Sequence, residues 1–262
     1  MKIDLISDLG EGYGRWKVAD DDGLLDVISS ANIACGFHAG DPSIMDHTVR
    51  MAIERGVGIG AHLGFPDLSG FGRRFMQLSS KEMEAILAYQ IGALQGVASR
   101  YDARVTHVSY HAAFGNAINA DETLAERLAK VIATMDRNLI FFSMPDQPVG
   151  RAAEKAGLRV LPIFLADRAY DVKGNLVPRG CEGAVIHDHA QLRDRVRQFL
   201  DSGTITTIEG ETRQIKASSI LVHSDTPGSV ELARVIRSEI ESGGGEIVPS
   251  HVLELVFYVT QL

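Results

Sequence analysis

Histidines and acidic residues recur in this sequence directly after short apolar runs, and such side chains can transfer protons or bind charged groups. Along the chain they are Asp8, His38, His62, His111, Asp167 with Arg168, and His223 with Asp225. Structural histidines scattered through a fold would not repeat this placement. Because titratable residues concentrate at functional clefts, we interpret these positions as parts of one site.

The first position belongs to a glycine-rich segment with two carboxylates, Asp8-Leu9-Gly10-Glu11-Gly12. When two carboxylates lie close together, one can stay ionised as a base or cation ligand while the pKa of the other rises. A turn or a helix cap explains one acid but needs no second. We therefore predict catalytic roles for both Asp8 and Glu11.

Two other segments have features of anion-binding sites. The glycine-punctuated run from Gly60 ends in the paired cations Arg73 and Arg74, and a guanidinium group pairs well with carboxylate or phosphate. The segment 223–229 leads from an apolar run into a predicted helix N-terminus, whose free N–H groups attract anions. An ordinary surface arginine pair and an ordinary helix cap are the alternatives.

Metal binding is a further possibility, since Asp8, His38 and His62 offer carboxylate and imidazole ligands for zinc and related ions. Their spacing is not a recognised zinc signature, so we expect no bound transition metal. His38 or His62 taken singly fits a hydrogen-bonded core histidine equally well. His107 lies deeper in its strand than His111 and is expected to pack in the core. Solvent exposure is expected for His47, His187, His189 and His251.

Short β-branched runs alternate with longer helical patterns throughout, which is typical of βαβ units around a parallel sheet. The predicted strands are 3–7, 31–37, 57–61, 104–110, 139–143, 160–165 and 219–222. Asp41-Pro42 predicts the start of a helix that runs to Arg55, and Ser79 with Glu82 has the spacing of a capping box before 83–98. A helix is also expected from Thr226-Pro227-Gly228 to about Glu241, and Lys173-Gly174-Asn175 indicates a small hairpin.

This α/β pattern fits a closed barrel better than an open Rossmann sheet, because Gly10, Gly12 and Gly14 lack the Gly-x-Gly-x-x-Gly spacing. In a parallel barrel the carboxyl ends of all strands surround one mouth, where such enzymes have their active sites. The sequence contains no linker, low-complexity tract or clear repeat, so we expect a single domain over residues 1–262.

The composition argues against several classes of protein. A net charge of −8, from 26 Lys and Arg against 34 Asp and Glu, repels a phosphate backbone and argues against nucleic-acid binding. Asp4 and Asp8 interrupt the first apolar run, and no other stretch has membrane-spanning length. The two cysteines, Cys35 and Cys181, are expected to be free thiols in a reducing compartment, so we expect a cytoplasmic protein.

These same segments resemble the LamB/YcsF family, whose members form the A component of ATP-dependent 5-oxoprolinase. The similar stretches are Asp8–Gly12, Ser30–Pro42, Gly60–Arg74, Ala166–Tyr170, Leu176–Arg179 and Asp225–Gly228. The resemblance implies an irregular seven-stranded β/α barrel related to glycoside hydrolases and polysaccharide deacetylases. It also implies ATP-coupled opening of 5-oxoproline to glutamate, with ATP and Mg²⁺ bound and with the B and C subunits as partners.

The resemblance further implies roles for individual residues. Asp8 or Glu11 would act as base or magnesium ligand, while protons would be handled, or an oxyanion stabilised, by His38, His62 and His111. Phosphate or the substrate carboxylate would be neutralised by Arg73, Arg74 and Arg168. The other residues expected to bind substrate or phosphate are Asn116, Asp167, His223 and Asp225.

The chain departs from the family pattern at several positions. Where the family reads Lys-Pro-His-Gly-Ala-Leu-Tyr-Asn, residues 109–116 read Ser-Tyr-His-Ala-Ala-Phe-Gly-Asn, so a cation and a phenol are absent. Other departures are Ile6 for asparagine, Leu63 for proline and Ser224 for glycine. Three functions are therefore considered: one component of an ATP-dependent lactam hydrolase, a catalytically reduced barrel that binds a small carboxylate or regulates its partners, and a metal-dependent amide hydrolase without ATP.

Overall fold

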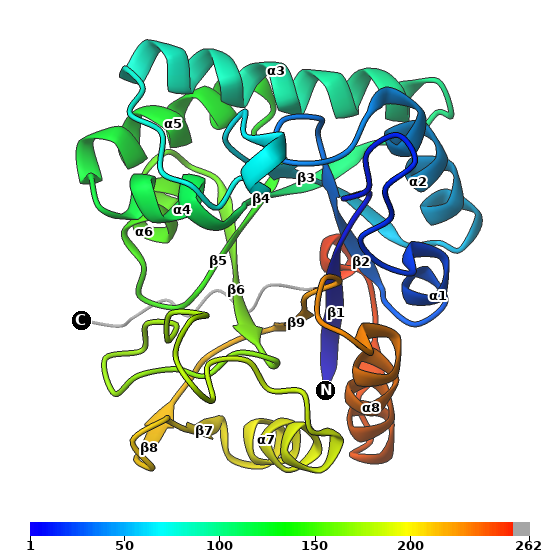
Figure 1. The fold of residues 1–262 in the computed structure, drawn as a ribbon, viewed down its shortest axis with the longest axis vertical. Coiled ribbons are helices and arrows are strands. Elements are labelled where there is room, and N and C mark those ends of the chain that lie inside the picture. Colours follow the sequence, from blue (N-terminus) through cyan, green and yellow to red (C-terminus); the bar gives the residue numbers. More distant parts are fainter. Residues whose placement is uncertain (254–262) are drawn as a thin grey trace.

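The computed structural model describes residues 1–253, and seven parallel strands of that range form a closed barrel with helices around its outside (Figure 1). The barrel strands are β1 (Lys2–Leu9), β2 (Ser30–Ala34), β3 (Gly58–Leu63), β4 (Val105–Tyr110), β5 (Ile140–Ser143), β6 (Arg159–Leu165) and β9 (Ser219–Val222). Each strand pairs with the next, and β9 pairs with both β6 and β1. The β1–β9 pairing decides between barrel and open sheet, and the predicted fold class and all seven predicted strands are confirmed.

The remaining elements surround this barrel. The helices are α1 (Asp21–Leu25), α2 (Pro42–Glu54), α3 (Ser80–Ser99), α4 (Ala112–Asn119), α5 (Glu122–Met135), α6 (Pro148–Lys155), α7 (His189–Ser202) and α8 (Ser229–Ser242), with short 3-10 turns at Leu68–Gly70 and Ser250–Val252. The sequence pattern did not predict the antiparallel pair β7 (Thr204–Thr206) and β8 (Thr212–Gln214), or β10 (Glu246–Ile247), which pairs with the start of β1. These strands are too short to show a clear hydrophobic period. Within residues 1–253, no helix combines the length and apolarity needed to cross a bilayer.

The predicted helix starts are largely confirmed. The Asp41 carboxylate accepts hydrogen bonds from the backbone N–H groups of Ser43 and Ile44. Ser79 and Glu82 form the expected capping box, so α3 begins at Ser80, three residues before the apolar period starts. At α8 the residue before the helix is Gly228, with a φ of +75°, and the Thr226 hydroxyl is directed elsewhere.

The predicted hairpin around residues 173–175 is also present, between β6 and α7. Tyr170 and Leu176 form an antiparallel bridge, and the Asp171 carboxylate accepts hydrogen bonds from the N–H groups of Lys173 and Asn175. This local hydrogen bonding is the kind that aspartate favours in turns. Because the hairpin follows β6 directly, it extends from the carboxyl end of that strand.

The core lies between the strands and the helices, and strands β2 and β3 are buried along their whole length. His107 is fully buried, as predicted, with its ring stacked on Phe142 at a centroid distance of 4.5 Å. A Cβ atom at Gly60 would overlap the His107 ring, so this close packing requires glycine. The four histidines predicted to be exposed, His47, His187, His189 and His251, are all exposed.

A buried carboxylate lies near the amino end of β1. Asp4 is fully buried and accepts hydrogen bonds from the hydroxyls of Ser29 and Ser219, at 2.8 and 2.7 Å. Burial raises the pKa of Asp4 to about 6, although the serine hydrogen bonds act against this rise. The folded protein therefore binds a proton at Asp4 at pH values where the unfolded chain has already lost it.

We expect this carboxylate to make stability depend on pH in a defined window. A folded pKa above the unfolded value of about 3.9 means that stability from Asp4 is fully present below pH 4 and is lost as pH rises towards 6. The difference in free energy of unfolding between the unmodified protein and Asp4→Asn should therefore decrease between pH 4 and 6 and stay constant above it. Urea unfolding of both proteins at several pH values measures this, and a pH-independent difference would contradict it.

Candidate active site

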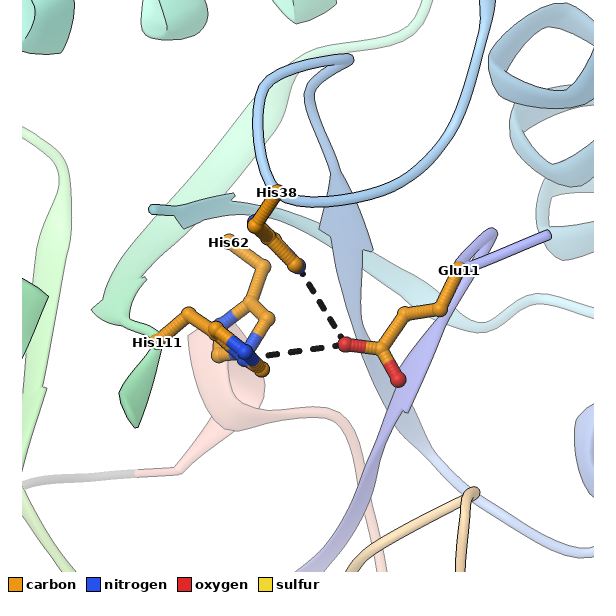
Figure 2. A group of neighbouring side chains, drawn as sticks. All are labelled: Glu11, His38, His62 and His111. Atoms are coloured by element: carbon orange, nitrogen blue, oxygen red, sulfur yellow. Dashed lines mark hydrogen bonds and ion pairs between the residues drawn. The ribbon is translucent and has the colours of Figure 1, made fainter. Parts of the chain in front are cut away.

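Four ionisable side chains point toward one another inside the carboxyl end of the barrel (Figure 2). Glu11 follows β1, His38 follows β2, His62 lies in β3 and His111 follows β4. Their relative exposure is 4%, 0%, 4% and 5%, so the group is closed off from solvent. We call these four residues the Glu–His cluster. Residues up to 100 positions apart in the chain thus meet at the mouth predicted from the strand pattern.

A chain of hydrogen bonds orients two of its imidazoles. His111 Nε2 lies 2.8 Å from the carbonyl oxygen of Phe71, and His62 Nε2 lies 3.0 Å from His111 Nδ1. His62 Nδ1 in turn contacts Ser109 Oγ at 2.7 Å. A carbonyl only accepts, so His111 carries its proton on Nε2. With both rings neutral, Ser109 donates to His62, His62 to His111, and His111 to Phe71.

The two predicted carboxylates are held by different partners. Asn32 donates to Asp8 Oδ1 at 2.9 Å, and the same oxygen lies 3.7 Å from His62 Nε2. Glu11 Oε1 lies 3.2 Å from His38 Nε2 and 3.6 Å from His111 Nδ1. Dashed lines in Figure 2 mark these two contacts. Ser224 donates to Glu11 Oε2 at 3.2 Å. Both acids therefore face the same group of imidazoles.

Burial dominates the proton affinities in this cluster. It lowers the pKa of His38 to about 3 and that of His62 to about 4, although the negative charge of Asp8 acts against the shift. The pKa of His111 is also held well below its usual range by burial. Burial, followed by the charge of Asp8, raises the pKa of Glu11 well above its usual range. At neutral pH the imidazoles are therefore neutral, and each keeps one nitrogen lone pair that can accept a hydrogen bond or act as a ligand.

A second pair lies beside the cluster. Asp167 accepts a hydrogen bond from His223 Nδ1 at 2.9 Å and from the Thr226 hydroxyl at 3.0 Å. Burial alone would lower the pKa of His223, but the charge and hydrogen bond of Asp167 outweigh it and raise that pKa. Burial would raise the pKa of Asp167, but the charge and hydrogen bonds of His223 lower it. The structure therefore pairs an acid that holds its charge with a histidine that holds a proton more tightly.

The predicted arginines occupy different environments. Arg73 and Arg179 both pair with Asp225, at 2.5 and 3.5 Å, which leaves one excess positive charge at this edge of the site. Arg74 instead pairs with Asp67, and its side chain is 64% exposed. These contacts place Arg73 at the mouth and direct Arg74 toward its own loop.

Two other predicted residues also lie outside the convergent group. Arg168 is buried and donates to the backbone carbonyls of Val177 and Ala184, so its guanidinium holds the excursion after β6 in place. Asn116 is exposed on α4. Neither side chain is directed at the Glu–His cluster by any contact within residues 1–253.

The loop between β3 and α3 covers the cluster and is tightly fitted to it. A Cβ atom at Gly64 would overlap the His38 ring at Nδ1, and one at Gly72 would lie 2.5 Å from His38 Cβ. Phe71 in this loop has a φ of +54°, and Ala112, next to His111, has a φ of +36°. Non-glycine residues rarely adopt such values, and strained backbone gathers at functional sites.

Several residues that contact the cluster or its neighbours were not predicted as site residues from the sequence. They are Asn32, Phe71, Ser109, Arg179, Ser224 and Thr226. The strand register explains two of them, because Asp8 is paired with Asn32 and His62 with Ser109 on adjacent strands. Knowledge of which strands are neighbours, and in what register, would have identified both residues.

Comparisons with known proteins identify the family and agree with this fold. Residues 3–254 match the model of the LamB/YcsF family. The chain belongs to this family. It is 58% identical over 250 residues to the 5-oxoprolinase A subunit of Pectobacterium atrosepticum, and the match covers 95% of this chain and 97% of that protein. It is 54% identical over 253 residues to a 5-oxoprolinase A subunit of Bradyrhizobium diazoefficiens, covering 97% and 99% of the two chains.

A solved structure of similar sequence has the same fold. The lactam utilization protein of Thermus thermophilus has a TM-score of 0.89 and 36% identity to this chain, and the comparison covers 95% of this chain and 99% of that one. The barrel with its irregular loops is therefore the LamB/YcsF fold.

Open cavities lie away from the cluster. One of about 390 Å³ is lined by Asp26, Arg55 and Arg237, among others, and another of about 250 Å³ by Tyr170 and Arg213, among others. Neither is lined by a residue of the Glu–His cluster. The loop between β3 and α3 packs directly on His38 and His111.

The close fit of the covering loop leads to a prediction for Gly64. We expect Gly64→Ala to lower the free energy of unfolding by about 1–3 kcal/mol, because the new methyl group overlaps the His38 ring. The matched control is Gly92→Ala on the exposed side of α3, where a Cβ atom meets nothing within 4 Å. This control should gain about 0.5–1 kcal/mol. Urea unfolding tests both, and equal effects of the two substitutions would refute the packing argument.

Proposed function

We propose that this protein is the A component of an enzyme that hydrolyses 5-oxoproline, or a closely related lactam, to the open amino acid with ATP hydrolysis. The observation that carries the proposal is the 58% identity, over nearly the whole of both chains, to a protein named as the A subunit of 5-oxoprolinase. The buried acid–base cluster supports it, because ring opening needs proton transfer at a site from which bulk water is excluded.

ATP use has a chemical reason in this proposal. A five-membered lactam is an unreactive amide, and transfer of a phosphoryl group from ATP to its oxygen would make the ring carbon open to attack by water. The C–N bond then breaks and leaves an acyl phosphate, which a second water hydrolyses, so that 5-oxoproline, ATP and two waters give glutamate, ADP and phosphate. The proton removed from water and the proton gained by the amine both require groups such as those gathered here.

The geometry favours particular roles for the carboxylates and imidazoles. Asp8 is held by Asn32 and lies 3.7 Å from His62, so it is suited to act as a base towards water. The hydrogen-bonded chain through His62 and His111 is suited to pass a proton to the leaving amine. Glu11 is suited to donate a proton, since burial raises its pKa.

The substrate carboxylate needs a cation near the mouth. Arg73 and Arg179 share one carboxylate, Asp225, and their side chains remain 39% and 29% exposed. We assign carboxylate recognition to these two arginines, because guanidinium groups form paired hydrogen bonds with carboxylates. Arg168 is less suited, since backbone carbonyls already occupy its guanidinium.

We also propose that partner proteins, corresponding to the B and C subunits, bind near the mouth of the barrel. Relatives carry names that designate them as A subunits, which supports a multisubunit enzyme. Tyr13 and Trp16, on the loop after β1, stack on each other and are 42% and 74% exposed. Exposed aromatic side chains of this kind are enriched at protein interfaces. We place the protein in the cytoplasm, where ATP is available and its unpaired cysteines stay reduced.

The main test is reconstitution with candidate B and C subunits. We expect 5-oxoproline to stimulate ATP hydrolysis, with glutamate formed in equal amount. Asp8→Asn should lower kcat about 100-fold or more, because a positioned base contributes at least this factor. The control is His47→Ala on the exposed surface of α2, which should leave kcat unchanged.

Two alternative functions predict other outcomes of the same assay. A catalytically reduced barrel would bind the substrate or its partners without turnover, whether Asp8 is replaced or not. A metal-dependent amide hydrolase would open the lactam without ATP and without partners. The intact chain from Ser109 through His62 and His111 favours an active enzyme over the reduced barrel.

The partner interface gives a separate prediction. Trp16→Ala should weaken assembly with the partner proteins at least 10-fold, because exposed tryptophans that become buried often dominate binding energy. The control is Ile208→Ala, an exposed apolar residue between β7 and β8. Analytical ultracentrifugation of the mixed components measures both, and unchanged assembly of the Trp16 variant would place the interface elsewhere.

A further inference from the structure

The donor atoms of the Glu–His cluster are spaced like ligands around one point. His62 Nε2 lies 3.0 Å from His111 Nδ1, and Glu11 Oε1 lies 3.2 Å from His38 Nε2. All four donor atoms lie within 4.8 Å of one another. Zinc binds imidazole nitrogen and carboxylate oxygen at about 2.0–2.2 Å, so tetrahedral ligand atoms lie roughly 3.3–3.6 Å apart. The rings of His38 and His111 are stacked at a centroid distance of 3.9 Å and are nearly parallel, so one of them must rotate before all four atoms face a single ion (Figure 2).

Outer contacts orient two of the three imidazoles, His62 and His111, as in metal sites, where the remote nitrogen of a histidine ligand bonds to an oxygen, whereas Nδ1 of His38 has no such partner. The Phe71 carbonyl keeps the proton of His111 on Nε2, so the Nδ1 lone pair points into the cluster. Ser109 holds His62 Nδ1 at 2.7 Å in the same way. If His62 donates to Ser109, its Nε2 lone pair also points inward. In the neutral, metal-free chain described above, His62 Nε2 instead donates to His111, so ion binding requires the proton of His62 to move to Nδ1, where Ser109 accepts it.

The charge at the cluster also favours a cation. Glu11 and Asp8 are both buried, and within residues 1–253 their ion-pair partners are histidines alone, with no lysine or arginine. The two cations of the covering loop, Arg73 and Arg74, are paired with Asp225 and Asp67. Buried carboxylates are costly without a positive partner. A divalent ion would supply this charge from the centre of the cluster.

We propose that the cluster binds one divalent transition-metal ion through four ligands: Glu11, His38, His62 and His111. Three imidazoles and one carboxylate suit zinc and its first-row neighbours, whereas Mg²⁺ and Ca²⁺ prefer oxygen ligands. This runs against the expectation from the sequence, which rested on spacing along the chain. The ligands come from the ends of four strands, so no short linear signature can represent them.

This metal site goes beyond the proposed lactam hydrolysis and does not depend on it. When bound, an ion here would polarise an oxygen atom of water or substrate. The protein's own contribution is to hold the imidazoles through Ser109 and Phe71 and to cover them with the loop between β3 and α3.

The test uses the full chain without a histidine tag, stripped with a chelator and titrated with Co²⁺ and then Zn²⁺. We expect about one Co²⁺ per chain, with the intense visible bands of tetrahedral coordination, which Zn²⁺ should abolish. Glu11→Gln and His62→Ala should weaken binding at least 100-fold, and Ser109→Ala about 10-fold to 100-fold. The control is His189→Ala, an exposed histidine at the start of α7, which should bind as the unmodified chain does.

Several results would overturn the proposal. These are less than half an equivalent of tightly bound Co²⁺ in the unmodified chain, a spectrum of octahedral coordination, or unchanged affinity in a folded His62→Ala protein. If His62→Ala does not fold, Ser109→Ala decides, because it removes only an outer contact, and unchanged affinity there also counts against the site. A bound metal without 5-oxoproline turnover would overturn the proposed function and leave the metal site standing.

Discussion

The parallel pairing of β9 with β1 is the constraint on which the rest of this structure depends. It closes the barrel and brings residues near position 220 beside residues near position 8. Ser7 donates to the Val222 carbonyl across this seam, and Ser224 donates to Glu11. These bonds join parts of the chain that are more than 200 residues apart. In an open sheet β1 and β9 would not be neighbours, and the Glu–His cluster and the Asp167–His223 pair would not share one mouth.

Closure also determines how polar groups inside the barrel are satisfied. Most buried polar side chains at the mouth have partners, as expected from the cost of leaving them unpaired. Among residues 1–253 the buried atoms without a partner in the protein are Asn32 Oδ1, His38 Nδ1, His107 Nε2 and Arg195 Nε. An unpaired buried group costs roughly 1–3 kcal/mol. Two of these four atoms, His38 Nδ1 and Asn32 Oδ1, belong to the cluster or to its direct neighbour. Unpaired hydrogen-bonding atoms are therefore concentrated at the site.

Some residues that depart from the family pattern make direct contacts in the site. Ser109 and Ser224, which stand where the family has lysine and glycine, are hydrogen-bonded to His62 and Glu11. Both serines therefore lie against the imidazoles and carboxylates of the site. Gly115 packs closely on Tyr110, because a Cβ atom at Gly115 would lie 3.1 Å from Tyr110 Cβ.

The sequence by itself determined the seven barrel strands, the main helix starts and the residues that follow each strand. These features depend on local periodicity and capping, which neighbouring residues specify. Only the tertiary structure decided that Arg73 faces the mouth while Arg74 pairs with Asp67, and that Arg168 binds backbone carbonyls. It also decided that the imidazoles share one centre with Glu11. Strand register, barrel closure and loop packing determine which side chains become partners in this site. They bring together residues that are far apart in the chain, so sequence separation does not reveal which residues will be close in space.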